Sequence, residues 1–242
     1  MGIAIPQVIT PSKASGAQVI DGSLKFDTNQ SNHLRRTPSS SGNRRTWTWI
    51  NWMKKTADAG SPDDALFTAG TGTNTQNRFI IKFSTSDQSL EIGQDVSGSF
   101  TLFRKTSQVF RDYNGWGQLV VAFDSTNSTA NDRLKIYWNG SQITDFATNN
   151  TISENYDTFV NFTNPHEICG DVGSYHGELD TFLSQVYFID GQQLDPSYFG
   201  FTDPLTNTWK PKKYEGTFGT NGFWLPMDGN SPIGEDKSGN GN

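Results

Sequence analysis

The segment 44–54 limits most strongly how this chain can fold. Its side chains alternate as they do in a β-strand, and apolar residues occupy both faces: Trp47, Trp49 and Met53 on one, Ile50 and Trp52 on the other. A strand that is apolar on both faces lies in the centre of a sheet and is covered on both sides. We therefore expect one face to pack in a core between two sheets. The other face is expected to lie under an arm, a tail or a neighbouring chain.

Further short strands are predicted along the chain, separated by turns rich in Gly, Asn and Asp. Asn139-Gly140 is a strong hairpin signal before the returning residues 142–144. Aromatic residues make up 13% of the chain, whereas the residue types that favour long helices are sparse. The pattern predicts an all-β fold, a two-sheet antiparallel jelly-roll sandwich, with strands at 65–69, 78–84, 89–93, 99–104, 117–124, 132–138, 158–162, 167–169 and 182–189.

The chain divides into three predicted parts. Residues 1–22 contain short apolar pairs and prolines without a lasting period, which is typical of an extended N-terminal arm. Residues 23–200 form the sandwich and end in a helical turn that Asp195 caps and Pro196 opens. Residues 201–242 form an irregular tail rich in aromatic residues, Gly and Pro, which is expected to wrap across the sandwich or a partner.

Charge and hydropathy exclude several classes of protein. The chain carries 19 Lys and Arg against 25 Asp and Glu, a net charge of −6, which argues against nucleic-acid binding because such proteins show a basic patch or stripe. Mean hydropathy is −0.60 and no apolar run approaches the length of a membrane span, so membrane insertion is not expected. No secretory signal is visible. The single cysteine, Cys169, forbids an intrachain disulfide and is expected to be buried in the core.

Four motifs stand in a characteristic order between residues 23 and 200. They read SLKFD with NHL, TWTWINW, WGQLVVAFD with LKIYWNG, and LSQVYFI with a following Leu194. In order and spacing they resemble the concanavalin A-like, laminin-G-type sandwich of lectins and glucanases. This resemblance implies the same two-sheet fold for residues 23–200.

A narrower resemblance rests on the segments GNRRTWTW, VYFIDGQQLDPSYFG, WKPKKYEGTFGTNGFWLP and DKSGNGN. They look like a laminin-G-like group of tailed-bacteriophage virion proteins, tail fibres or other appendages, in which the last motif is usually followed by more chain. The resemblance implies a non-enzymatic virion protein, made in the host bacterial cytoplasm, that contacts other virion subunits. A homotrimer is expected by analogy with fibres.

Adhesion to host-surface carbohydrate is the first functional hypothesis that follows from this resemblance. Capsid decoration or a fibre role is the alternative. A glycan-active enzyme and a stand-alone lectin remain further alternatives.

No catalytic residues are predicted. Some glycosidases of the same superfamily carry paired carboxylates and a third acid on one strand, but here Glu178 and Asp180 are followed by apolar residues at the third position. His166 and Cys169 point to opposite faces of an extended strand, so they do not form a nucleophile–base pair. The three histidines also lack the spacing of a zinc site.

Calcium is the only cofactor that the sequence suggests, because laminin-G-like sandwiches often bind it at the rim. Carboxylate and amide oxygens are the ligands that Ca²⁺ prefers, but Asp and Asn are also ordinary turn residues. The candidate ligands form two groups: Asp124, Asn127 and Asp132, and Asp171, Glu178 and Asp180.

The tryptophans in the predicted strands are expected to build the core: Trp47, Trp49, Trp52, Trp116 and Trp138. Apolar residues of the arm and the tail lie outside the sandwich pattern and are candidates for contacts with other chains. These interface candidates are Ile3, Ile5, Val8, Ile9, Trp209, Phe218, Phe223 and Trp224.

Overall fold

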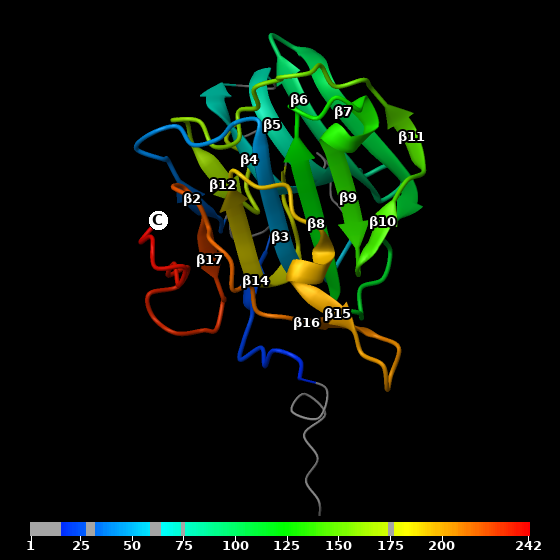
Figure 1. The fold of residues 1–242 in the computed structure, drawn as a ribbon, viewed down its shortest axis with the longest axis vertical. Coiled ribbons are helices and arrows are strands. Elements are labelled where there is room, and N and C mark those ends of the chain that lie inside the picture. The colour runs from blue at the N-terminus through cyan, green and yellow to red at the C-terminus, as the bar shows by residue number, and fades with distance from the viewer. Residues whose placement is uncertain (1–15, 28–31, 59–63, 74–75, 174–176) are drawn as a thin grey trace, which may run out of the picture.

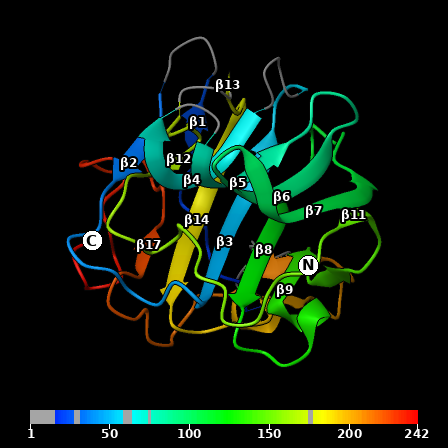
Figure 2. The same ribbon diagram turned by 90° about the horizontal axis from the view of Figure 1, so that it is seen from above.

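Two antiparallel β-sheets lie face to face in the computed structural model, which describes residues 16–27, 32–58, 64–73, 76–173 and 177–242 (Figures 1 and 2). This arrangement confirms the predicted jelly-roll sandwich. The predicted interface residues Ile3, Ile5, Val8 and Ile9 lie outside the described residues.

The first sheet has seven strands in the order β1-β14-β3-β8-β9-β10, with β17 also paired to β14. The central position of β3, between β14 and β8, confirms the prediction made from its two apolar faces. All described pairs of this sheet are antiparallel. Its strands are β1 (Leu24–Phe26), β3 (Thr46–Lys55), β8 (Gly117–Asp124), β9 (Leu134–Trp138), β10 (Ser141–Ile143), β14 (Thr181–Asp190) and β17 (Phe223–Leu225).

The second sheet has eight strands in the order β11-β7-β6-β5-β4-β12-β2, and β13 pairs with β4 in parallel. It arcs across the upper part of Figure 2, facing β14, β3 and β8. Its strands are β2 (Leu34–Arg36), β4 (Asp64–Thr73), β5 (Gln76–Phe83), β6 (Ser89–Val96), β7 (Ser99–Val109), β11 (Phe146–Asn149), β12 (His166–Ile168) and β13 (Gly177–Glu178).

Two 3-10 turns and a small two-stranded sheet complete the described elements, namely η2 (Ala130–Arg133), η3 (Pro196–Tyr198), β15 (Gly200–Thr202) and β16 (Trp209–Pro211). The predicted turn after the last long strand is confirmed: Asp195 accepts a hydrogen bond from Ser197 N–H, and Pro196 opens η3. In the described part of the chain no helix has the length and apolarity needed to cross a membrane.

The main core lies between the two sheets and contains large aromatic side chains. Trp49 stacks on Phe67 with ring centroids 4.4 Å apart, and Trp47 packs against Phe79 and Phe123. Cys169 is fully buried in this core, as predicted.

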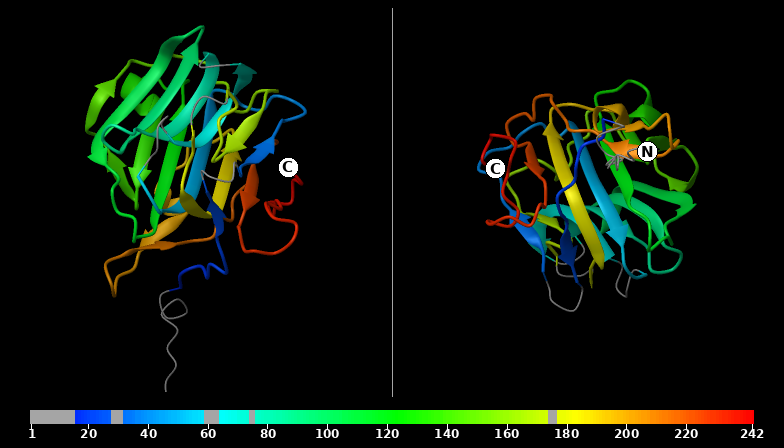
Figure 3. Two further views of the ribbon diagram at one scale, coloured as in Figure 1. Left: turned by 180° about the vertical axis from the view of Figure 1, so that it is seen from behind. Right: turned by 90° about the horizontal axis from the view of Figure 1, so that it is seen from below.

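A second apolar cluster covers the outer face of the seven-stranded sheet. Ile50, Val120 and Tyr187 face outward from three neighbouring strands and are buried by residues that follow β14, including Phe199 and Tyr214. This following segment, orange to red in Figure 3, runs along the outside of the sheet. The predicted cover of the second apolar face is therefore the chain's own tail.

The prediction of a strand at 158–162 is wrong, because the segment forms turns. Side chains bind its amides: Phe159 N–H donates to Gln94 Oε1 at 2.7 Å, and Asn161 N–H donates to His166 Nε2 at 2.9 Å. Asn161 also has a φ of 65°, a left-handed conformation that ends an extended run.

Candidate functional site

Three tryptophans from distant parts of the chain meet in one open groove, where the arm lies beside β16 at the bottom of Figure 1. Trp52 of β3 is buried beneath it, Trp116 precedes β8, and Trp209 begins β16. Residues 20–23 and 208–211 complete the walls, and the cavity measures about 530 Å³. We call this site the tryptophan groove.

The indole of Trp209 is held in place by the protein itself. Its Nε1–H donates to Gln118 Oε1 at 2.8 Å, and Gln118 Nε2–H in turn donates to the carbonyl oxygen of Phe199 at 2.9 Å. The ring lies directly over Gly140 and Gly200, where any Cβ atom would overlap it. The ring is therefore already oriented before a ligand binds, which lowers the entropy lost on binding.

Trp116 is 42% exposed, so the prediction that it builds the core is wrong. Trp138 fills this end of the core instead: its ring lies against Gly117 and meets Phe110 edge-on, with centroids 5.0 Å apart. Trp116 stands one residue before β8 begins and is left at the surface beside the groove.

Polar groups surround the indole rings of the tryptophan groove. Asp21 of the arm and Ser23 just after it supply donors and acceptors on one wall, and Thr208 and Lys210 do so on the other. An aromatic surface with a few polar groups around it can hold the apolar face of a sugar ring while binding its hydroxyl groups.

The groove was missed in the sequence because it combines residues 52, 116 and 209, which no local pattern connects. One signal was present: the alternation in 44–54 puts Trp52 on the face opposite Trp47 and Trp49. That face was expected to be covered, and Trp52 is only 6% exposed, but the groove stays open above it.

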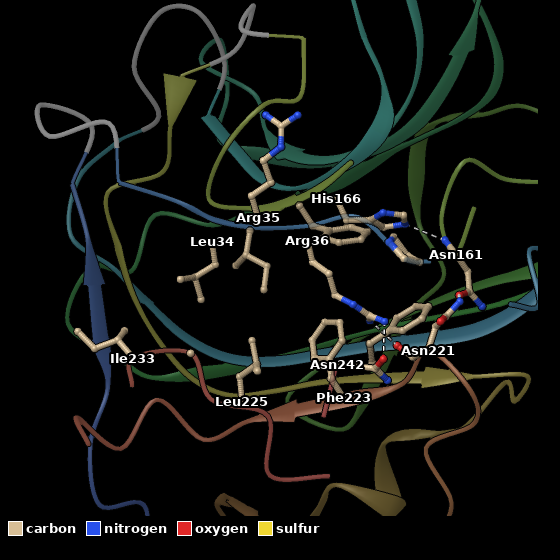
Figure 4. A pocket seen from close by; sticks show the side chains of 15 residues that line it. Leu34, Arg35, Arg36, Asn161, His166, Asn221, Phe223, Leu225, Ile233 and Asn242 are labelled. Carbon is tan, nitrogen blue, oxygen red and sulfur yellow. Dashed lines mark hydrogen bonds between the residues drawn. The ribbon is translucent and has the colours of Figure 1, made fainter. Parts of the chain in front are cut away.

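A second cavity, of about 290 Å³, opens between the edges of the two sheets (Figure 4). Its walls come from β2 and β12 of the eight-stranded sheet and from β14 and β17 of the seven-stranded sheet. Apolar side chains form one end, and Arg36, Asn221 and Asn242 gather at the other. We call it the amphipathic cavity.

His166 lines the amphipathic cavity as a neutral ring. Its Nε2 accepts the hydrogen bond from Asn161 N–H, and its Nδ1 lies 2.8 Å from the carbonyl oxygen of Asn164, to which it donates in the neutral form. Burial lowers the pKa of His166 to about 4. The imidazole is therefore uncharged near neutral pH and acts as a structural acceptor.

The first group of predicted calcium ligands is occupied by local hydrogen bonds. Asp124 Oδ1 accepts from Thr126 N–H at 3.0 Å, and Asn127 Oδ1 accepts from Thr129 N–H at 2.9 Å. Asp132 pairs with Lys135 at 3.2 Å. These oxygens stabilise the turn rather than converging on one point.

In the second predicted group, Asp171 forms a buried ion pair with Arg78, with an N–O distance of 2.5 Å. Asp180 immediately precedes β14. The side chain of Glu178 lies outside the described residues. Within the described ranges, no three His, Cys, Asp or Glu side chains form a group that could hold a metal ion. Binding of Ca²⁺ stays a prediction.

The four interface candidates of the tail lie against this chain. Phe223 packs on Phe188, and Trp224 stacks on Tyr187 with centroids 5.7 Å apart. Phe218 lies beside the same tyrosine, and Trp209 lines the tryptophan groove. Contacts of these residues with other chains stay a prediction.

Comparison with known proteins adds fold-level similarity only. No protein-family model matches the chain, and a search of curated proteins found no match either. Among solved structures, the SAP-like pentraxin of Limulus polyphemus is 16% identical, with a TM-score of 0.48, over 74% of this chain and 80% of the pentraxin chain.

Two further similar structures come from bacterial carbohydrate-active proteins. Domain 4 of the arabinanase AbnA from Geobacillus stearothermophilus, solved with arabinotriose, is 14% identical over 73% of this chain and 76% of that chain, with a TM-score of 0.49. The CBM40 of the Ruminococcus gnavus IT-sialidase is 14% identical over 68% of this chain and 95% of that chain, with a TM-score of 0.44. Similarity at this level does not indicate what the present chain binds.

Proposed function

We propose that this chain is a non-enzymatic structural protein of a tailed-bacteriophage virion, part of a tail fibre or another appendage, that binds host-surface glycans through the tryptophan groove. The observation that carries glycan binding is the meeting of Trp52, Trp116 and Trp209 in one open groove. The virion role is supported by the motifs GNRRTWTW and DKSGNGN, which resemble those of phage appendage proteins.

The groove suits a sugar because of how its rings are presented. Trp116 is exposed and Trp209 is oriented by Gln118, so apolar ring surface is available without prior rearrangement. The polar residues at the walls would bind hydroxyl groups that remain around the stacked sugar.

The lining of the groove supports binding rather than hydrolysis. Glycoside hydrolysis uses two carboxyl groups flanking the scissile bond. Asp21 is the one carboxylate among the described residues that line the groove. We therefore expect no release of reducing ends when the protein is incubated with laminarin or host polysaccharide, and a steady increase in reducing ends would contradict a purely binding role.

A glycan array of bacterial capsular and lipopolysaccharide sugars tests the proposed binding, followed by titration of the strongest ligand. We expect Trp116→Ala and Trp209→Ala each to weaken that affinity about tenfold or more, the loss typical of an aromatic anchor. Phe100→Ala is the matched control, because Phe100 is 48% exposed on β7 of the other sheet. Unchanged affinity in both tryptophan variants would rule out the groove as the binding site.

The virion role needs a separate experiment on the particle. Gold-labelled antibodies against the folded chain should decorate a tail fibre or another appendage of intact phage. Labelling of the capsid would favour decoration instead, and the absence of the chain from purified particles would refute a virion role.

A further inference from the structure

The amphipathic cavity is a second candidate binding site and shares no lining residue with the tryptophan groove. It lies between the strand edges of the two sheets, next to the C-terminal residues of the chain (Figure 4). Its two ends differ in chemistry, and that difference indicates what kind of molecule fits.

One end of the cavity is apolar. Leu34, Leu225 and the exposed Ile233 stand at this end in Figure 4. The other apolar residues of the lining are Phe67, Ile168, Phe188 and Phe223. A dry cavity of about 150 Å³ lined by such residues takes up benzene. A volume of about 290 Å³ therefore has room for a hydrocarbon body about twice that size.

The other end carries the guanidinium of Arg36. Its Nη1–H donates to the carbonyl oxygen of Asn221 at 2.9 Å, and its Nη2–H donates to Asn242 Oδ1 at 2.5 Å. Both acceptors are neutral, and no carboxylate of the described residues forms an ion pair with Arg36. A guanidinium has five N–H donors, so this cation keeps capacity for an anionic partner.

The other titratable groups near the cavity do not supply an anionic partner for Arg36. Arg35 points out of the cavity in Figure 4 and is paired with Glu167 at 3.0 Å. His166 is neutral and already bonded through both ring nitrogens. Burial lowers the pKa of Arg36, and the charge of Asp236 partly opposes that effect. The Asp236 carboxylate accepts a hydrogen bond from Asn242 N–H at 2.9 Å and, among the described residues, forms no ion pair with Arg36.

We propose that the amphipathic cavity binds a small amphipathic carboxylate whose hydrocarbon body lies between Leu34, Leu225 and Ile233 and whose carboxylate pairs with Arg36. A straight-chain acid of about ten carbons matches the volume. The carboxylate would accept bidentate hydrogen bonds from the guanidinium, which neutral groups of the same size cannot reproduce.

Isothermal titration of the full chain with decanoate, decanol and acetate tests this proposal. We expect decanoate to bind about tenfold or more tightly than decanol, because a hydrogen bond between two charged groups is stronger than one to an alcohol. Acetate should bind too weakly to measure, because it lacks the hydrocarbon body. Equal affinity for decanoate and decanol, or no binding of either, would overturn the proposal.

Two kinds of variant separate the contributions of charge and volume. Arg36→Met should remove the preference for decanoate over decanol, whereas Arg36→Lys should retain part of it. Leu34→Trp should weaken the binding of both decanoate and decanol, because the larger side chain fills the apolar end of the cavity. Leu205→Trp is the control, because Leu205 is 80% exposed and does not line the cavity. Decanoate binding that survives unchanged in both Arg36→Met and Leu34→Trp would place the ligand elsewhere. A thermal melt of each variant identifies any that fails to fold, and Arg36→Lys then provides the decisive comparison.

Discussion

At the residue scale, Asp190 connects three segments that are far apart in the sequence. Its carboxylate accepts hydrogen bonds from Asn43 N–H at 2.8 Å, from the Asn161 side-chain amide at 2.6 Å and from Asn221 N–H at 3.1 Å. The side-chain amide of Asn221 also donates to Asn161 Oδ1 at 2.7 Å. Asp190 is 7% exposed, so these bonds form where water competes little, and they hold the polar end of the amphipathic cavity together.

Replacing Asp190 should therefore destabilise the whole sandwich. We expect Asp190→Ala to lower the free energy of unfolding by about 2–4 kcal/mol, because three donors lose a charged acceptor. The exposed Asp145→Ala should change it by no more than about 0.5 kcal/mol. Urea denaturation measures both, and a loss below about 1 kcal/mol for Asp190→Ala would show that the three segments are held by other contacts.

His166 should make stability depend on pH. Its pKa is about 4 in the folded chain and near its ordinary value of about 6.5 when unfolded, so the unfolded chain binds more protons between these values. The contribution of His166 to the free energy of unfolding is therefore complete above about pH 6.5 and decreases as the pH falls toward 4. This loss amounts to about 3 kcal/mol at most.

The His166→Gln variant checks this expectation, since glutamine does not titrate. The difference in unfolding free energy between the original chain and His166→Gln should shrink as the pH falls from 6.5 to 4. Urea denaturation at several pH values gives the difference directly, and parallel curves for the two proteins would contradict the assignment.

At the scale of elements, a bulge in β14 determines how both ends of the chain join the sheet. The register shifts between Ser184 and Tyr187, where Gln185 adopts a left-handed φ of 49°. On one side of the bulge Leu183 pairs with Leu24 of β1, and on the other Val186 pairs with Leu225 of β17. Two strands from opposite ends of the chain therefore lie along one edge of β14.

The side-chain amide of Gln185, at the bulge, is buried and links the arm, the sheet and the tail. Gln185 Oε1 accepts hydrogen bonds from the Gln18 side chain at 2.9 Å, from Tyr187 OH at 3.1 Å and from Trp224 Nε1–H at 2.9 Å. The arm residue Gln18 additionally donates its N–H to the carbonyl oxygen of Pro211. The described part of the arm thus lies on the tail and on β14.

Trp224 is the tail residue whose removal should most clearly uncover the sheet. It stacks on Tyr187 with an interplanar angle of 5° and is half-buried. We expect Trp224→Ala to lower the unfolding free energy by about 2–3 kcal/mol, less than for a fully buried tryptophan.

Trp224→Phe keeps the stacking, loses only the bond to Gln185 and should lower the unfolding free energy by about 1 kcal/mol. Leu205→Ala, in the exposed loop between β15 and β16, is the neutral control for denaturant titration. Equal stability of Trp224→Ala and the control would show that the tail contributes little to the cover.

At the scale of the whole molecule, sandwich and tail should unfold together, because β17 belongs to the same sheet as β3 and β14. The single cysteine offers a clean probe, since Cys169 is fully buried and follows β12 directly. Reaction of its thiol with a chromogenic disulfide should begin only at the urea concentration where far-UV circular dichroism is lost. Labelling at lower urea would mean that the edge at β2 and β12 opens separately.

A chelator melt tests the calcium prediction for the intact chain. Asp124 and Asn127 are engaged in turn hydrogen bonds, and Asp171 and Asp132 are paired with Arg78 and Lys135, so we expect the melting temperature to be the same with and without EDTA. Any bound ion stabilises the folded state by mass action. A drop of several degrees in EDTA, restored by added Ca²⁺, would therefore show that a calcium site exists.

Features that depend on neighbouring residues could be predicted from the amino-acid sequence. Alternation in 44–54 placed Trp47 and Trp49 in the core and required a cover for the opposite face, since side chains of a strand point to alternate sides. Asn139-Gly140 and Asp195 likewise determined a hairpin and a capped turn through local backbone chemistry.

Which surfaces remain open, and which distant residues share a site, depends on long-range packing. Trp116 is exposed because Trp138 fills the end of the core, and residues 158–162 form turns because Gln94 and His166 bind their amides. The tryptophan groove combines residues as far apart in the sequence as Ile20 and Pro211, and the amphipathic cavity combines Leu34 with Asn242. Periodicity specifies the face on which a side chain lies, but the atoms that cover that face come from long-range packing, which no local pattern encodes.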